Sequence, residues 1–506
     1  MKQKLIGTQI VVMVIIILGK FVGFIRESVL ASKFGTSYEM DVYSYSMTVL
    51  LFLATIGYSI TTTVIPIFTK NKIKSKEEQE ELANNLITIM FFLGLIFNII
   101  TVIFSESIVK LLAPGFDDKA LIIAKNLIII MNFSLISIFI QSVISGILQA
   151  YNRFYTSAAM AGVGNIVTII YLMFFVDKYG IYGFGVSTLI AYLLQLIINI
   201  PSYRQIGFKY KFILDFKDSQ IINIFKLTIP ILVSTCIIQL FSMITTFYGS
   251  LIGEGAISTF NYSNRLINLT VEIFAIGMSM VIYPVLSKVD IKEDSESFNN
   301  ILKKGILIMC FVIIPIFILM VVLNKEIVSF LYERNEFTRE NTILTSQVLL
   351  ILSPIIIFSS IRDLLNKASY SLGEAKISMK ISTYMIMLAV VGNFLSYRKL
   401  GVYGLGLITT FVNAIGTIYT FIFLKKKFDF IRISIRTHII RIFISSTIMG
   451  IIVFVIKEMN FRIIIYSKLF ELLFLGLLGV IVYILFITLL FINDIINYKK
   501  NGVKLK

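Results

Sequence analysis

Long apolar runs, separated by short polar stretches, follow one another along the whole chain. A helix needs about 20 mainly apolar residues to cross a lipid bilayer, and we count about fourteen runs of that kind. Their centres lie near Val12, Leu51, Leu95, Phe133, Ile170, Ile190, Val233, Phe274, Phe311, Leu352, Leu388, Phe411, Thr447 and Gly479. The pattern predicts an all-α polytopic membrane protein with about fourteen transmembrane helices.

The composition agrees with this prediction. Of the 506 residues, 57% are hydrophobic and only 15% are charged, whereas about a quarter of the residues in soluble domains are charged. Cys236 and Cys310 lie inside apolar runs without metal-ligand spacing, which argues against a disulfide framework or a metal site. The first apolar run has no small-residue cleavage site, so we expect it to remain as a span.

The basic residues predict the orientation in the membrane. The net charge is +17, and most lysines and arginines gather in alternate loops. The positive-inside rule places these loops, and with them both termini, on the cytoplasmic side of the membrane. Topology and attraction to anionic lipids explain the charge, so we expect no nucleic-acid partner. The basic stretches are KNKIKSKEEQEE, YRQIGFKYKF, NNILKKG, KKKFDFIRISIR and NYKKNGVKLK.

Two long parts of the chain resemble each other. Residues 34–70 align with residues 252–288, and YGIYGFGVSTLIAY aligns with KLGVYGLGLITTFV, at offsets of about 218 to 221 residues. A duplicated set of about six spans enters the membrane from the same side twice, as in transporters whose substrate site lies between the two halves. We therefore expect an N-terminal six-helix lobe over 1–218, a C-terminal six-helix lobe over 219–434, and two extra helices with a basic tail over 435–506.

Several spans carry polar stripes. On an ideal helix, Asn261, Arg265, Asn268 and Glu272 fall within a stripe roughly 60 degrees wide. Because lipid cannot solvate such groups, the stripes must face protein or water. The simplest explanation of the hydroxyls and amides is contact between helices. The second and fourth spans contribute Asp41, Tyr45, Thr48, Thr55, Ser59, Ser134, Ser137, Gln141 and Ser145.

Charged residues inside spans favour a functional cavity over simple helix contacts. A central charge costs at least about 2.5 kcal/mol and lines a functional cavity by default. Arg265 and Arg26 are two such residues. The alternative is a structural ion pair, either Arg26 with Asp41 or Arg265 with Glu272.

A further cation, Lys20, precedes Arg26 on the first span. The two residues stand about 240 degrees apart on an ideal helix, so spacing alone does not place them on one face. A bend at Gly19 or Gly23 would bring them together.

Enzymes and nucleotide-driven pumps find little support in the sequence. A lipid-using transferase needs acid and base residues in sizeable loops, and the predicted loops have roughly twenty residues at most. The phosphate-binding pattern GxxxxGK[ST] is absent from the chain. We therefore predict a transporter and no catalytic residues.

Five segments of the sequence, taken together, are specific enough to indicate a protein family. They are GKFVGFIRESVLASKFGTSYEMDVY, IVKLLAPGF, GILQAYNRF, the pair NRLINL and YPVLSK, and LYERNEFT. They resemble the signature segments of the MurJ (MviN) family of lipid II flippases, in the multidrug/oligosaccharidyl-lipid/polysaccharide exporter superfamily. The resemblance implies alternating access that moves an undecaprenyl-pyrophosphate-linked disaccharide-pentapeptide to the outer leaflet. It also implies a central cavity, and a hydrophobic groove for the lipid tail on the last two helices.

The resemblance also assigns residues. Arg26, Asp41 and Arg265 match cavity positions of the family, and Lys20 stands where the family usually has another arginine. Cations suit this role because a pyrophosphate needs charge-assisted partners when it leaves water. The family's paired-arginine segment is missing from the second span, which reads MTVLLFLAT with Ala54 and Thr55 in the arginine places. The predicted substrate-binding set is Lys20, Arg26, Asp41, Arg265, Glu272, Asn261 and Asn268.

Ion coupling has two equal candidates. Some family members resemble sodium-linked transporters through an aspartate in the seventh helix, where this chain has Thr245. Asn393 and Thr409 are further oxygen ligands for Na⁺, but none of the three is charged. The other candidate is the membrane potential, acting on the cationic cavity. We expect no other cofactor.

The sequence leaves two other classes of substrate as alternatives. One is a different undecaprenyl-linked glycan, such as a capsule or teichoic-acid precursor, and the other is a cationic drug exported by an antiporter of the superfamily. An antiporter for cationic drugs would favour acidic cavity residues, whereas the distinctive charges here are mostly basic. The expected partners are a lipid-linked anionic glycan precursor, membrane lipids and, through the resemblance, the cell-wall synthesis machinery.

Overall fold

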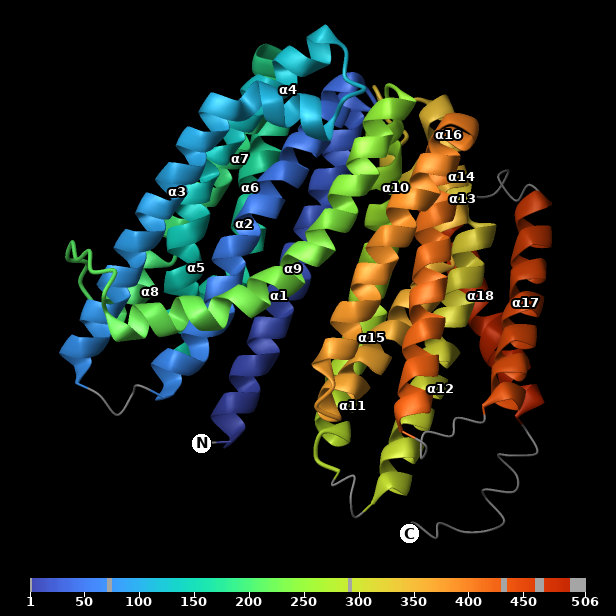
Figure 1. Ribbon diagram of the computed structural model, residues 1–506. Helices are drawn as coiled ribbons and strands as arrows, with labels where there is room; N and C mark the ends of the chain where they lie inside the picture. The colour runs from blue at the N-terminus through green and yellow to red at the C-terminus, as the bar shows by residue number, and fades with distance from the viewer. Residues whose placement is uncertain (1, 71–74, 290–293, 429–434, 460–467, 492–506) are drawn as a thin grey trace. The chain divides into compact units, whose positions relative to one another are not determined.

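The computed structural model describes residues 2–70, 75–289, 294–428, 435–459 and 468–491. Every regular element among these residues is a helix (Figure 1). The chain divides into two compact units: residues 1–258 with 334–338, and residues 259–333 with 339–506. The fold is therefore all-α, as the hydrophobic pattern predicts.

The first unit is built from α1 to α9 and the first residues of α10. Their bounds are α1 Lys2–Phe34, α2 Tyr38–Lys70, α3 Lys76–Leu112, α4 Asp118–Asn132, α5 Ser134–Ala150, α6 Tyr155–Phe174, α7 Val176–Ile197, α8 Ile200–Gln205 and α9 Ser219–Ile252. In this unit α2 packs against α4, α5 and α9, while α1 packs against α6. Its core includes the fully buried side chains of Leu50, Ile60 and Phe139.

The second unit holds the rest of α10 and the helices that follow. Their bounds are α10 Ala256–Thr270, η2 Val271–Ile276, α11 Gly277–Leu286, α12 Ser295–Val322, α13 Asn324–Tyr332, α14 Arg339–Leu352, α15 Ile355–Ser371, α16 Ala375–Lys427, α17 Arg436–Glu458 and α18 Lys468–Leu490. Here α12 packs against α15 and α17, and α17 packs against α18. Gly450 and Gly479 allow close packing, because a Cβ atom would lie 2.5 Å from Ile318 and 2.8 Å from Leu319, respectively.

The packing boundary differs from the boundary inferred from the repeat. The repeat places residues 219–258 in the second lobe, whereas α9 packs against α2 and α3 of the first unit. A repeat records how the sequence was duplicated, and the units record which helices pack together. The proposed lobe boundaries therefore stay a prediction.

The duplication is visible in the backbone. Gly180 interrupts α7 with φ 53° and ψ −147°, and Gly401 interrupts α16 with φ 55° and ψ −138°. These two glycines are aligned in the sequence repeat, as are Gly35 and Gly253, which also have positive φ values. Only glycine adopts such dihedrals without strain, so both copies keep it at the same turn.

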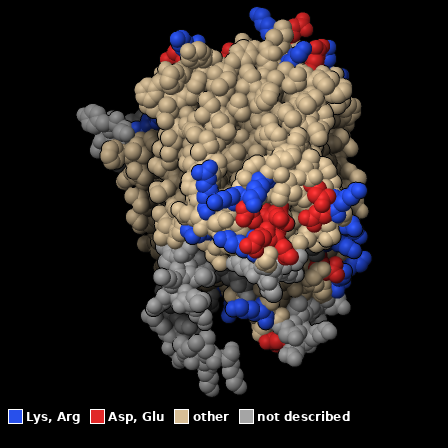
Figure 2. Space-filling model, turned by 90° about the vertical axis from the view of Figure 1, so that its left-hand side faces the viewer, with Lys and Arg blue, Asp and Glu red and all other residues tan. Residues whose placement is uncertain are grey.

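Eleven helical stretches of the described chain are long and apolar enough to cross a membrane. One of them, Lys376–Lys427, is interrupted at Gly401 and so contains two spans. Adding α1 and the run from α10 to α11 gives the fourteen helices expected. On the face of the first unit seen in Figure 2, charged side chains gather near two levels, with a broad uncharged belt between them. Such a belt suits the apolar core of a bilayer.

Candidate functional site

Asp41 lies at the start of α2 and caps the segment that leads into α10. Its Oδ2 accepts the backbone N–H of Gly255 and its Oδ1 accepts that of Ser258, both at 2.7 Å. The side chain is buried, with 3% of its surface exposed. A carboxylate suits this place because the N–H groups of a first helical turn lack partners within the helix and carry partial positive charge.

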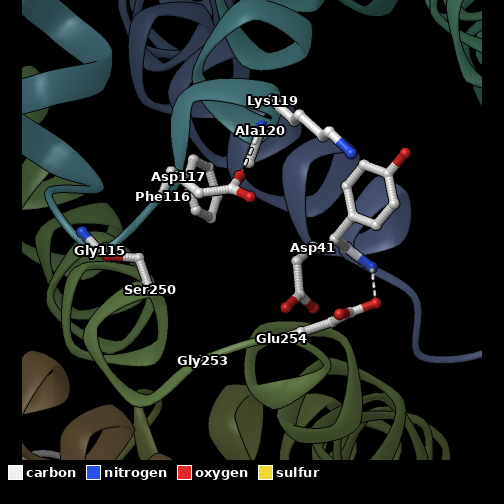
Figure 3. A pocket seen from close by; sticks show the side chains of 10 residues that line it. Asp41, Gly115, Phe116, Asp117, Lys119, Ala120, Ser250, Gly253 and Glu254 are labelled. Atoms are coloured by element: carbon white, nitrogen blue, oxygen red, sulfur yellow. Dashed lines mark hydrogen bonds between the residues drawn. The ribbon is translucent and has the colours of Figure 1, made fainter.

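A second contact joins the same two loops. The backbone N–H of Tyr38 donates to Glu254 Oε1 at 3.1 Å (Figure 3). Gly255 has φ 79°, and a Cβ atom there would lie 2.8 Å from the carbonyl oxygen of Thr36. The chain therefore needs glycine at position 255 for both its conformation and the close approach.

These loops border a cavity of about 410 Å³ in the first unit (Figure 3). Asp117, Lys119 and Ser250 also line it. Asp117 uses one oxygen to cap α4, accepting the N–H of Ala120 at 2.8 Å. The acidic groups of the cavity thus serve mainly to close helix ends and loops.

Arg26 lies on α1, beside its sequence neighbour Glu27, with which it forms an ion pair. The hydroxyls of Tyr43 and Tyr192 are close enough to interact with it electrostatically. Its Nε is buried and has no hydrogen-bond partner. The suggested Arg26–Asp41 pair is therefore wrong, because Glu27 pairs with the arginine while backbone N–H groups occupy both oxygens of Asp41.

Lys20 lies on the same helix and is half-buried. Helix α1 is continuous through Gly19 and Gly23, and these glycines allow close packing against α6. A Cβ atom at Gly19 would lie 3.4 Å from the backbone of Gly162, and one at Gly23 would lie 2.8 Å from Asn165. The glycines thus have a packing role that spacing alone did not reveal.

The polar stripe on α10 lies on the surface of its helix. Arg265, Asn268 and Glu272 are exposed and Asn261 is half-buried, as the sequence spacing predicts. The opposite face, with Tyr262 and Leu266, is buried. Helix α10 ends at Thr270, and Glu272 lies in the π-helical turn that follows. Such turns are rare and occur often at functional sites, but ideal helical spacing does not foresee them.

The hydroxyl-rich stripes of the second and fourth spans are buried in protein, which confirms that they avoid lipid. Asp41, Tyr45, Thr55, Ser59, Ser134, Ser137, Gln141 and Ser145 are all less than 6% exposed, and Thr48 is half-buried. Tyr45 donates its hydroxyl to the carbonyl of Ile108 on α3. Ser59 lies 3.1 Å from the hydroxyl of Thr235 on α9. Tyr45 and Ser59 thus join helices, as the simplest explanation holds, whereas Thr48 and Thr55 donate to carbonyls of their own helix.

The three candidate ion ligands are buried, and they lie in different units. Thr245 is in the first unit, where its hydroxyl donates to the carbonyl of Phe241 at 3.0 Å. Asn393 and Thr409 lie on the two halves of α16, near the point where Gly392 faces Ile408. Asn393 Oδ1 is buried without a hydrogen-bond partner, so it can accept a ligand. Whether the three oxygens form one Na⁺ site stays a prediction.

Sequence reasoning missed a charged cluster on α15. Asp363 and Lys367 form an ion pair at 2.8 Å, and Arg362 Nη1 lies 2.9 Å from Met385 Sδ on α16. All three side chains are half-buried within a span. The letters IRDLLNK inside the tenth apolar run were the signal, because ionisable residues in a span indicate function by default.

The last two helices are fastened to the second unit by polar contacts as well as packing. Lys457 on α17 bonds to Glu326 of α13, and Lys468 on α18 lies 3.1 Å from Glu333. Burial raises the pKa of Glu333, but hydrogen bonds from Ser329, Lys468 and Thr342 outweigh it and leave the pKa below its usual value. Tyr483 also donates its hydroxyl to the carbonyl of Phe311 at 2.8 Å.

A duplicated set of membrane-crossing helices, with cationic and polar residues placed inside the spans, defines a polytopic membrane transporter. A family model described as "Lipid II flippase MurJ" matches residues 30–487. The chain belongs to this lipid II flippase family.

Individual relatives agree with this assignment. The chain is 26% identical to the probable lipid II flippase MurJ of Buchnera aphidicola subsp. Acyrthosiphon pisum, over 90% of this chain and 91% of the relative. It is 24% identical to the corresponding protein of Thermotoga maritima, over 96% of each chain. A solved structure of lipid II flippase MurJ in an inward closed conformation matches with a TM-score of 0.83 and 25% identity, over 96% of this chain and 100% of that chain.

A more distant neighbour shares only the fold. An inward-facing multidrug resistance MATE family transporter of the MOP superfamily matches with a TM-score of 0.68 at 15% identity, over 81% of this chain and 94% of that chain. This likeness shows a shared fold and says nothing about the substrate.

Proposed function

We propose that this protein carries lipid II from the inner to the outer leaflet of the bacterial plasma membrane by alternating access. The observation that carries the proposal is the match to the lipid II flippase family along residues 30–487. Buried and stripe-forming cations in both units fit an anionic pyrophosphate cargo. The protein acts as a transporter, without a catalytic step.

Arg26 and Arg265 are the residues that we propose for binding the pyrophosphate. Arg26 already has one carboxylate partner, Glu27, but its buried Nε has none. A buried N–H group without a partner is costly, and a phosphate oxygen would satisfy it. Arg265, Asn268 and Glu272 form an exposed polar face on α10 and η2 that offers donors to a headgroup. Lys20 and Asn261 complete the proposed set.

The loop contacts around Asp41 supply the conformational part of the proposal. Carriage by alternating access needs contacts that hold one side shut and then break. Two charge-assisted hydrogen bonds to backbone N–H groups and the Tyr38–Glu254 bond are contacts of this kind. With both termini in the cytoplasm, as the basic loops indicate, these contacts lie at the outer side.

For coupling we propose that the membrane potential suffices. The cargo headgroup is anionic, so a potential that is negative inside favours its movement outward. The candidate Na⁺ ligands Thr245, Asn393 and Thr409 carry no formal charge, and Thr245 and Thr409 each donate a hydroxyl to a helix carbonyl. Sodium coupling is the alternative.

Another undecaprenyl-linked glycan is the second candidate cargo. Ala54 and Thr55, which stand in the places of the arginine pair implied by the family resemblance, are buried at 0% and 3% exposure. The first unit therefore offers no cation to a headgroup at these two positions. A cargo whose headgroup needs fewer cationic partners than that of lipid II would fit the loss of these two cations.

Depletion of the protein in its host separates these cargoes. If lipid II is the cargo, lipid II accumulates in the inner leaflet, and precursors of other glycans stay at their normal levels. Accumulation of a different undecaprenyl-linked glycan, with a normal level of lipid II, would identify that glycan as the cargo.

A further inference from the structure

An apolar groove of about 400 Å³ lies between α6 and α7, and its lining residues are not among those of the polar sites described above. Val167 and Ile170 of α6 form one wall, and Val186 and Ile190 of α7 form the other. Ile170, Val186 and Ile190 are each more than 40% exposed, so the groove opens to the surroundings of the first unit. In a membrane those surroundings are lipid.

Two hydroxyls of the groove wall, those of Tyr171 and Ser187, are already satisfied by the protein. The hydroxyl of Tyr171 donates to the carbonyl of Gly180 at 2.6 Å, and that of Ser187 donates to the carbonyl of Phe184 at 2.8 Å. The wall therefore presents carbon to whatever fills it. A hydrocarbon chain loses nothing by entering such a groove, whereas a polar ligand would lose its hydrogen bonds.

A cation stands at one end of the groove. The ammonium group of Lys178 lies 5.2 Å from the ring centre of Tyr179, and this ring lines the groove. The neighbouring acid, Asp177, is paired with Lys33 at 2.9 Å. The charge next to the groove mouth is therefore positive, which complements the phosphate of a phospholipid.

The length of the groove matches one leaflet. Beyond the break at Gly180, α7 rises by roughly 14 Å from Ile181 to Ile190, at about 1.5 Å per residue. Half of a bilayer core measures about 15 Å. An acyl chain that lies along the groove would thus reach from the headgroup level to the middle of the membrane.

We propose that this groove binds one acyl chain of an anionic phospholipid, with the lipid phosphate on Lys178. The site is distinct from the proposed lipid II path and does not depend on it. In the orientation given by the basic loops, the bound lipid belongs to the outer leaflet.

The chain contains no tryptophan, so a single introduced tryptophan reports on one place. The test uses the full chain carrying Ile190→Trp, in phosphatidylcholine vesicles that contain a small fraction of phospholipid with brominated acyl chains. Bromine quenches tryptophan only at close range. Brominated phosphatidylglycerol is compared with brominated phosphatidylcholine at equal fractions. The matched reporter is Ile99→Trp, at an exposed position on α3 of the same unit.

At Ile190→Trp we expect quenching that corresponds to a roughly fivefold preference for phosphatidylglycerol, the ratio typical of one cation near a lipid phosphate. At Ile99→Trp the two lipids should quench equally. Adding Lys178→Ala to Ile190→Trp should abolish the preference. Adding Lys110→Ala, which removes an exposed cation near the same end of the unit, should leave it unchanged.

Three results would overturn the proposal. The first is equal quenching by the two lipids at Ile190→Trp while Lys178 is present. The second is an equal loss of preference in the Lys178→Ala and Lys110→Ala variants. The third is weaker quenching at Ile190→Trp than at Ile99→Trp by both lipids, which would mean that lipid does not enter the groove.

Discussion

Asp41 Oδ1 accepts a 2.7 Å hydrogen bond from the backbone N–H of Ser258 and so caps the first turn of α10. The two residues are separated by 217 positions in the chain. The second carboxylate oxygen accepts the N–H of Gly255, so one buried side chain satisfies two backbone groups. Loss of this carboxylate therefore affects both the stability of the loop and the contact that we propose must open during transport.

Replacement of Asp41 tests this contact. Asp41→Ala leaves two buried N–H groups without a partner, at about 1 to 3 kcal/mol each, and we expect lower thermal stability and lost complementation. Asp41→Asn keeps one good acceptor and should lie between Asp41→Ala and the wild type. Unfolding of the purified protein in detergent gives the stability, and growth of a depleted strain gives the activity.

The matched control for Asp41 is Ser46→Ala. Ser46 is buried on the same helix, but its hydroxyl bonds only to the carbonyl of Val42 within α2. Its loss should change stability and growth little. If Asp41→Ala behaved like Ser46→Ala in both assays, the capping contact would have no role in folding or transport.

Variants of Arg265 separate cargo binding from a structural ion pair. If Arg265 binds pyrophosphate, Arg265→Ala combined with Glu272→Ala restores stability at best, and transport stays lost. Arg265→Lys keeps the charge without the bidentate geometry and should give partial activity. Complementation is measured together with expression level and thermal stability.

Full transport by the double variant would contradict cargo binding by Arg265. In that case, removal of the arginine would have harmed the protein only by leaving Glu272 without its neutralising charge. Arg26→Gln provides a parallel test in the first unit, where Glu27 is the ion-pair partner.

The last two helices offer a third test. If α17 and α18 hold the lipid tail, ending the chain after Ile435 should abolish transport while headgroup binding to the remaining helices stays measurable. The truncation uncovers the face of α12 that packs against α17, so folding must be verified by thermal unfolding. Complete loss of headgroup binding in a truncated protein that still folds would argue that these helices belong to the headgroup site.

Coupling is tested in proteoliposomes with the ion gradient and the potential set separately. We expect transport to continue when Na⁺ is replaced by K⁺, and to slow when the potential is collapsed, because the cargo is anionic. Asn393→Ala should then leave the rate nearly unchanged. A rate that requires Na⁺ and falls with Asn393→Ala would instead identify the buried Asn393 Oδ1 as an ion ligand.

The general fold could be predicted from the sequence because its signals are local. Apolar runs predicted the spans, and the aligned glycines predicted the repeat that reappears as matching breaks at Gly180 and Gly401. The exposed stripe of Arg265 and Asn268 also followed from helical spacing.

The partners of the site residues could not be predicted in the same way. Asp41 bonds to backbone N–H groups, which every residue carries, so no side-chain pattern marks Gly255 and Ser258. The π-helical turn at Glu272 departs from the ideal spacing on which the stripe was drawn. Arg362 lies inside an apolar run, but no pattern in the sequence marks Met385 on α16 as its neighbour.

The central claim is that this protein moves lipid II between leaflets, and a direct flipping assay tests it most closely. Purified protein is reconstituted into vesicles with lipid II, and the lipid II exposed on the outer surface is measured with time. We predict protein-dependent movement of lipid II that is lost in the Arg26→Gln variant and in the Arg265→Ala, Glu272→Ala double variant. Equal movement in wild type and variants would contradict the roles proposed for Arg26 and Arg265, and absence of movement by the folded wild-type protein, with a membrane potential applied, would contradict the central claim.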